Sequence, residues 1–130
     1  VQTLGRTLDG SSLDLLTFGS GAPIWIIARQ HPGESMAEWF VEGMLQRLLD
    51  PNDALARTLR ERFAFHVVPN MNPDRSVRGH LRTNASGATP HRAWPAPTRQ
   101  RSPEAAHVRD ELDVTALRLR HDSDVYDRPH

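Results

Sequence analysis

The chain has 130 residues and balances 16 Lys plus Arg against 16 Asp plus Glu, so its formal net charge is zero. This length predicts one domain, and 38% apolar with 25% charged residues is ordinary globular usage that excludes wholesale disorder. Cysteine is absent, which excludes a disulfide framework and a Cys nucleophile and restricts any metal site to His, Asp and Glu ligands. No apolar run reaches the roughly 18 residues of a membrane-spanning helix, so we expect no membrane association.

The amino terminus lacks the features of a secretory signal. Val1 is followed by Gln-Thr-Leu-Gly instead of a basic region and then an apolar one. Together with the absence of cysteine, this predicts a cytoplasmic protein. Because the chain does not begin with Met, we expect its start to be a cut boundary.

Two strands are expected first in the chain. Residues 13–18 alternate loosely between apolar and polar side chains, and residues 24–28 are continuously apolar. His31 precedes Pro32, which disfavours helical backbone at His31, and Gly33 follows. Residues 31–34 are therefore expected to form a loop at the end of a buried strand.

A helix is expected directly after this loop. Ser35 and Glu38 match a capping box, and the helical pattern ends at Asp50 and Pro51. The apolar residues that recur at helical spacing are Met36, Ala37, Phe40, Val41, Met44, Leu45, Leu48 and Leu49. A second helix is expected at residues 54–62 and a third strand at 63–68, which are rich in aromatic and β-branched residues. This alternation of strands and helices predicts an α/β fold.

The second half of the chain has a different character. Residues 70–74 have the composition of a turn, and residues 84–97 form a long Pro-containing segment with little periodicity. Ser102 before Pro103 predicts a helix start, and this helix is expected to end near Leu112. Residues 115–119 are expected to form one last strand, whereas residues 120–130 show no pattern.

His31 and Glu34 form the first candidate site. Zinc accepts an imidazole nitrogen and a carboxylate oxygen, and a loop at the end of a strand allows both side chains to turn toward one point. The alternative is a surface histidine and a glutamate placed near the positive end of a helix dipole. A single His-x-x-Glu pair does not decide between them.

A basic segment forms the second candidate site. Residues 75–109 contain seven arginines against one acid. Guanidinium groups bind carboxylates through paired hydrogen bonds and stabilise charge on a carbonyl oxygen. The candidate residues of this site are Arg78, Arg82, Arg92, Asn72, Asn84 and His91. The alternatives are a solvated charged face or a phosphate-binding surface, but Trp94 is the only aromatic residue there, so we expect no nucleic-acid partner.

The remaining histidines suggest no site. His66 falls within a strand pattern and is expected to be a packed or edge residue, whereas His80 and His107 are expected to be exposed. The sequence contains no Gly-x-Ser-x-Gly motif, which makes a serine nucleophile of the α/β-hydrolase type an unfavoured alternative.

Several ordered motifs resemble one family. They read Gln-His-Pro-Gly-Glu-Ser-Met-Ala-Glu-Trp-Phe at 30–40, Val-Pro-Asn-Met-Asn-Pro-Asp at 68–74, Gly-His-Leu-Arg-Thr-Asn at 79–84 and Arg-Ala-Trp at 92–94. From residue 4 to about 113 the chain resembles the zinc carboxypeptidases of the carboxypeptidase A type, nearest the cytosolic carboxypeptidase branch and its bacterial relatives. The resemblance implies an α/β fold with a mixed central sheet and flanking helices. Residues 1–130 would form a single, incomplete catalytic domain of this type.

The resemblance also implies residue roles. His31 and Glu34 would be the first two ligands of one zinc ion. Arg82 would polarise the scissile carbonyl as a catalytic residue, and Arg92 with His91 would bind the substrate carboxylate. The implied reaction is the hydrolytic removal of a C-terminal amino acid from a peptide or protein by a zinc-activated water. The oligomeric state is left open.

The chain departs from the family at several positions. Arg75 stands where the family has Gly, and His91 stands where it has Asn, so the neutral side chain offers one donor instead of two. The third zinc ligand falls near Asp124, with His121 the nearest histidine, and neither matches the family motif. The family's general base, a Glu, would lie outside this chain. The alternative function is therefore a non-catalytic relative that binds carboxylate-ended peptides.

Overall fold

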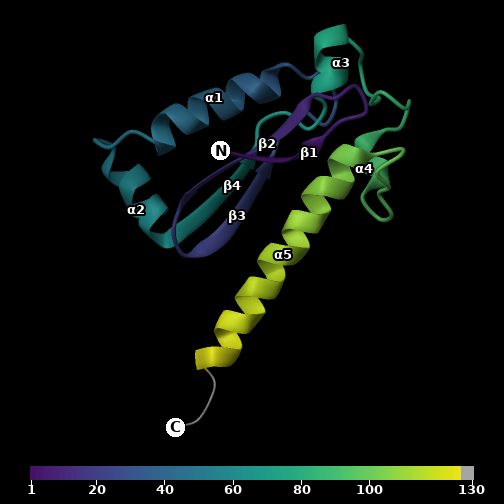
Figure 1. Cartoon of the computed structure of the whole chain (residues 1–130). Coiled ribbons are helices and arrows are strands. Elements are labelled where there is room, and N and C mark those ends of the chain that lie inside the picture. Colours follow the sequence, from purple (N-terminus) through teal and green to yellow (C-terminus); the bar gives the residue numbers. More distant parts are fainter. Residues whose placement is uncertain (127–130) are drawn as a thin grey trace.

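The computed structural model describes the backbone of residues 1–126 and the side chains of residues 1–119. Figure 1 shows the arrangement of the elements. In chain order they are β1 (Gln2–Arg6), β2 (Ser12–Gly19), β3 (Ala22–Ile27), α1 (Met36–Leu48), α2 (Ala54–Arg62), β4 (Phe63–Val68), α3 (Pro73–Arg78), α4 (Pro90–Ala93) and α5 (Pro103–Tyr126).

The four strands form one mixed sheet in the order β1-β2-β4-β3. β2 pairs antiparallel with both β1 and β4, whereas β3 pairs with β4 in parallel, with Ile26 opposite Val67. The parallel pair follows from the connection through α1 and α2, which returns the chain to the start of the sheet before β4 begins. The mixed central sheet that the resemblance implies is therefore present.

Helices cover both faces of the sheet (Figure 1). On one face, Phe65 and Val67 of β4 pack with Val41 and Leu48 of α1. Neighbouring strand residues point to opposite faces, so Val68 belongs to the second core, which includes Leu13, Leu15, Met71 and Val108. α1 and α2 thus lie on one side of the sheet and α5 on the other.

α1 begins where the sequence predicts, but the predicted capping box is wrong. Ser35 itself has helical backbone angles, and its side chain makes no capping hydrogen bond. Glu38 instead contacts Arg29 and Asn70. The apolar stripe is also only partly buried: Val41 faces the core, while Phe40 is 67% exposed. Packing against the sheet therefore selects only one side of the predicted stripe.

β1 and α5 differ from the sequence-based prediction, and the short helices α3 and α4 stand where a turn and a long loop were expected. β1 was not predicted, because its five residues contain a glycine and little apolar pattern. The predicted strand at residues 115–119 is wrong, since this segment continues α5. Ala116, Leu117 and Arg118 are strong helix formers, and no proline or glycine interrupts the helix after Pro103. None of the helices that the structure describes is long and apolar enough to cross a bilayer.

α5 approaches the sheet closely at its first strand. The imidazole of His107 lies over Gly5 of β1, where a Cβ atom would overlap the ring. Arg99 donates to His107 Nδ1 across 2.7 Å and also forms an ion pair with Asp110. These two contacts of Arg99 hold the His107 ring in place. Glycine at this position in β1 therefore allows the helix to pack on the strand.

Candidate metal and carboxylate site

The site is built where the parallel strands β3 and β4 end. Ala28 N–H donates to Val68 O across 3.0 Å, and Met71 N–H donates to Ala28 O across 2.9 Å, so the two chains stay paired just beyond the strands. Arg29 then adopts a left-handed backbone with φ of 52°, which turns the chain sharply out of the sheet. This turn places residues 30–34 at the carboxyl edge, the usual position of ligand sites in α/β sheets.

A polar network supports the turn from below. The Arg29 guanidinium forms an ion pair with Glu38 and donates through Nε to Pro32 O across 2.9 Å. Asn70 Nδ2 donates to the other Glu38 oxygen across 2.9 Å. Because Arg29 is largely shielded from solvent and each partner has a second bond, the network fixes the loop relative to α1.

His31 stands at the centre of the candidate site. Its Nδ1 atom lies 3.0 Å from Glu34 Oε1, and its Nε2 atom lies 2.7 Å from His91 Nδ1. The two imidazole rings meet edge to face, with centroids 4.8 Å apart. His31 is half-buried and Glu34 is exposed, so a solvent ion has access to the pair.

The His31 and Glu34 donors fit two positions of a zinc site. One imidazole nitrogen and one carboxylate oxygen lie next to each other in the loop, as two ligands of the same metal ion must. Among the side chains of residues 1–119, no group of three or more His, Asp and Glu side chains could hold a metal ion. His121 and Asp124 lie on the backbone of α5, but their side chains fall outside the described residues.

Long-range hydrogen bonds tie two further segments to the loop. Leu81 O accepts from Gly33 N–H across 3.0 Å. The buried Asn72 side chain donates both to Gln30 O and to Thr83 O, at 3.4 and 3.2 Å. Trp94 Nε1–H donates to Gln30 Oε1 across 3.0 Å. Segments 79–84 and 90–94 are therefore held against residues 30–34.

Four arginines of the basic segment are bound to the protein itself. Arg75 donates to Asn84 O, Ala85 O and His80 Nε2, and Arg78 pairs with Asp9 across 2.8 Å. Arg99 bonds to His107 and Asp110, and Arg109 donates to the carbonyls of Trp94 and Pro95. Within the described part of the chain, the guanidinium groups that make no hydrogen bond or ion pair in this segment are those of Arg82, Arg92 and Arg101.

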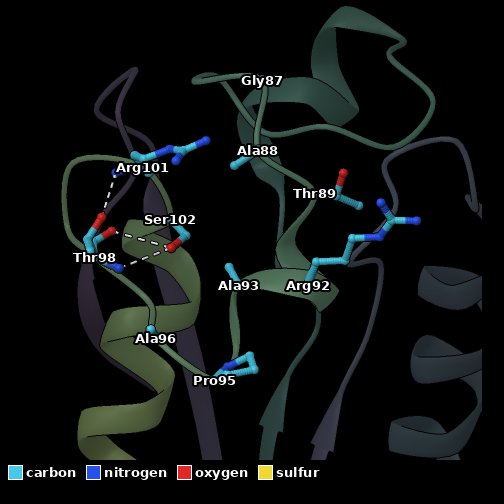
Figure 2. Close-up of a pocket in the computed structure, with 10 residues that line it drawn as sticks. All are labelled: Gly87, Ala88, Thr89, Arg92, Ala93, Pro95, Ala96, Thr98, Arg101 and Ser102. Carbon is cyan, nitrogen blue, oxygen red and sulfur yellow. Dashed lines mark hydrogen bonds between the residues drawn. The ribbon is translucent and has the colours of Figure 1, made fainter.

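A pocket of about 490 Å³ lies beside α4. Figure 2 shows Arg92 and Arg101 on opposite sides of this pocket, with Thr98 and Ser102 joined by hydrogen bonds at its rim. Two cationic side chains that have no partner among the described residues make the pocket suitable for an anion. Arg92 lines this pocket, and His91, the residue before it in sequence, contacts His31.

The buried Asn84 joins this region to α5. Its Nδ2 atom donates to Arg101 O across 2.7 Å and to Glu104 Oε2 across 3.1 Å. Its Oδ1 atom accepts from Ser86 and from Ala88 N–H. Burial raises the pKa of Glu104, which is 1% exposed and has one oxygen without a hydrogen bond. The segment that presents His91 and Arg92 is therefore anchored in the interior.

The structure also describes His66, His80 and His107, none of which forms a hydrogen bond with His31, Glu34 or His91. His66 stacks on Trp25 with ring centroids 4.7 Å apart, and burial lowers its pKa. This agrees with its prediction as a packed residue. His80 is exposed as expected. The expectation for His107 is wrong, because it is half-buried over Gly5, and burial followed by the charge of Arg99 lowers its pKa.

The sequence pattern did not reveal several residues that build the site. Gln30, Asn70 and Glu104 each bond to residues that are far apart from them in the chain, and the sequence pattern indicates a role in the site for none of them. Asn84, a candidate for carboxylate binding, is instead a buried residue that bonds to Arg101 O and Glu104. Polar residues that flank strand ends are the one available signal, because buried polar groups must find partners. Their partners depend on the fold and cannot be assigned from spacing.

Three comparisons bear on this arrangement. An uncharacterized protein of Zymomonas mobilis is 58% identical over 117 residues, which cover 89% of this chain and 31% of that protein. Human cytosolic carboxypeptidase 4 is 40% identical over 87 residues, covering 67% of this chain and 8% of the relative. The crystal structure of a metallo-carboxypeptidase from Burkholderia cenocepacia superposes with a TM-score of 0.83 at 53% identity, over 87% of this chain and 32% of that one.

These matches agree with the resemblance in the motifs. The chain spans about a third or less of the length of these relatives, so it contains only part of their fold. The model of the zinc carboxypeptidase family matches residues 1–112, which include the loop of His31 and the segments of Arg82 and Arg92. The chain therefore belongs to the zinc carboxypeptidase family.

Proposed function

We propose that residues 1–130 are part of one metallocarboxypeptidase domain in which His31 and Glu34 bind a single zinc ion. The whole protein then removes C-terminal amino acids from peptides or proteins. The observation that supports this proposal is the 3.0 Å approach of His31 Nδ1 to Glu34 Oε1, with His91, the neighbour of Arg92 in sequence, in contact with His31. A cytoplasmic location is proposed with it, supported by the human relative named as a cytosolic carboxypeptidase.

The proposed chemistry divides between the metal and the arginines. Zinc, when bound, supplies Lewis acidity and lowers the pKa of a bound water. Arg82 follows Leu81, whose carbonyl is bonded to the His31 loop, and it donates to the carbonyl oxygen on which negative charge develops. Arg92 binds the terminal carboxylate through paired hydrogen bonds, and one N–H of His91 adds a third. The general base is proposed to come from outside the described residues.

One observation favours a second candidate function. The side chains of residues 1–119 include no third metal donor beside His31 and Glu34. A chain with only these two donors would keep the Arg82 and Arg92 site and bind carboxylate-ended peptides without hydrolysing them. Metal dependence separates this function from the first one.

Zinc stoichiometry tests the first candidate. The purified chain is stripped with a chelator, reloaded with zinc and analysed for metal, beside a His31→Ala plus Glu34→Ala variant. One zinc per chain that is lost in the variant supports the site, and peptide hydrolysis is then assayed. Equal zinc in both proteins refutes the metal site.

Peptide binding tests the arginine site in the same preparation. Arg92→Ala is expected to weaken binding of a peptide with a free C-terminal carboxylate by about 10–100-fold, because hydrogen bonds to a charged group are worth about 1.5–3 kcal/mol. The wild type and Arg92→Ala should bind a C-terminally amidated peptide with the same affinity. Arg78→Ala is the matched control, since Arg78 is already paired with Asp9. An equal effect of both substitutions would contradict the assignment of Arg92.

A further inference from the structure

His91 makes a contact that its expected role as a carboxylate-binding residue does not explain. It lies in α4, 60 residues after His31, and its Nδ1 atom is 2.7 Å from His31 Nε2. α4 is held in position by the buried Pro90 and by the hydrogen bond from Trp94 to Gln30. The contact therefore results from two fixed segments and not from a long, flexible side chain.

The two nitrogens of His31 have different surroundings. Nδ1 faces Glu34, the second metal donor, and Nε2 faces His91. A metal ion between His31 and Glu34 must use the bare Nδ1, so the ring proton of His31 is then on Nε2. The N–H of a ligating histidine requires an acceptor, which fixes the orientation of the ring. His91 Nδ1 is the side-chain atom at hydrogen-bond distance from this N–H.

We propose that His91 is a positioning residue for His31: its Nδ1 atom accepts the hydrogen bond from His31 Nε2–H and so keeps His31 Nδ1 directed toward Glu34. This inference rests on the proposed metal site. The usual acceptors of this N–H are a carboxylate, a backbone carbonyl or a water molecule, and the neutral imidazole of His91 differs from a carboxylate because it brings no negative charge.

The same contact determines what His91 presents to a substrate. A neutral imidazole that accepts at Nδ1 carries its own proton on Nε2. His91 therefore keeps one N–H donor, next in sequence to the guanidinium of Arg92. Positioning of His31 and recognition of a carboxylate are thus compatible roles, because they use opposite nitrogens of one ring.

Three substitutions at position 91 separate these roles. Asn places its amide group where His has Nδ1, whereas Gln places it where His has Nε2. We expect His91→Ala and His91→Gln to lower zinc affinity by about 10–100-fold, and His91→Asn to lower it by less than about tenfold. Zinc affinity is measured by competition with a chromophoric chelator. Because His91 is exposed, thermal unfolding of the metal-free variants should match the wild type.

Nitrogen-15 NMR of the histidine rings gives a second readout. The wild type should show a scalar coupling between His31 Nε2 and His91 Nδ1, and His91→Ala should shift the His31 Nε2 resonance in the metal-free chain. If the wild type binds no zinc but shows this coupling, the proposed metal site fails while the positioning contact stands. Absence of the coupling, or equal zinc affinity in the wild type and His91→Ala, overturns the inference.

Discussion

Replacement of Asn84 tests whether the site segment is anchored as described. Asn84 is fully buried, and its side chain donates to Arg101 O and Glu104 while accepting from Ser86 and Ala88. Asn84→Ala removes all of these bonds at once. It also removes the side-chain donor that Glu104 Oε2 uses, so among the described residues neither oxygen of this buried carboxyl group then accepts a hydrogen bond from another side chain.

The expected loss follows from these contacts. An internal hydrogen bond contributes about 1 kcal/mol net, and a buried polar group left without a partner costs about 1–3 kcal/mol. We expect Asn84→Ala to lower the free energy of unfolding by about 4 kcal/mol. This sum includes the two hydrogen bonds that Asn84 donates, the acceptor that it provides to the 84–88 turn, and the buried carboxyl group of Glu104 that is left without this donor. This is a large part of the 5–15 kcal/mol that usually stabilises a domain.

Urea unfolding followed by circular dichroism measures this loss. Asn84→Asp is the matched control, because it keeps the acceptor but turns an oxygen toward the carboxyl group of Glu104. Its folded state binds a proton that the unfolded state releases, so its stability should fall as pH rises. Adding Glu104→Gln to Asn84→Asp should restore stability. A loss below about 1 kcal/mol for Asn84→Ala would refute the anchoring role.

Three shorter predictions concern other contacts. Gly5→Ala should lower the unfolding free energy by about 1–3 kcal/mol through overlap with the His107 ring, and adding His107→Ala should recover most of it in urea titrations. Burial raises the pKa of Glu104 above its ordinary 4.5, so its contribution to stability falls as pH rises through that higher pKa. The melting temperature of Glu104→Gln should therefore decline less across this pH range than that of the wild type. Burial lowers the pKa of His66 below 6.5, so stability should fall as pH drops below that value, and His66→Phe should remove this part of the pH dependence while keeping the stack on Trp25.

Local sequence signals predicted the elements in the middle of the chain well. The predicted helix at 54–62 and strand at 63–68 coincide with α2 and β4. Asp53 caps α2 by accepting a hydrogen bond from Ala56 N–H. The run of aromatic and β-branched residues coincides with β4. Such signals lie within a few residues of the feature that they specify, and this is why they can be interpreted without the fold.

The carboxyl end of the chain was harder to predict for the opposite reason. Residues 115–119 alternate weakly and were interpreted as a strand, yet they extend α5. Leu117 is 63% exposed and Leu119 is 43% exposed, so these two leucines do not belong to a buried apolar stripe of the kind that indicates a helix in a sequence. Propensity alone, through the absence of any helix breaker after Pro103, was the better guide here.

The candidate site shows the same division between local and long-range information. His31 and Glu34 are three residues apart, and their contact could be anticipated from a loop at a strand end. The approach of His91 to His31 spans 60 residues and depends on hydrogen bonds made by Gln30 and Asn72. No spacing rule connects such positions, so the motif indicated the residues but not their contact.

The basic segment acquires a different meaning once its contacts are known. Four of its seven arginines bind carbonyls, histidines or acids of the protein and so hold the segment in place. The guanidinium groups of Arg82, Arg92 and Arg101 have no hydrogen bond or ion pair with the side chains of residues 1–119, and Arg92 and Arg101 line one pocket of about 490 Å³. A polyanion requires a row of exposed cations, whereas one carboxylate group needs only one guanidinium group at a fixed position, which binds it through two parallel hydrogen bonds. Most arginines of the basic segment therefore hold the segment in place. The arginines without partners among the described residues suit a small anionic group such as a carboxylate.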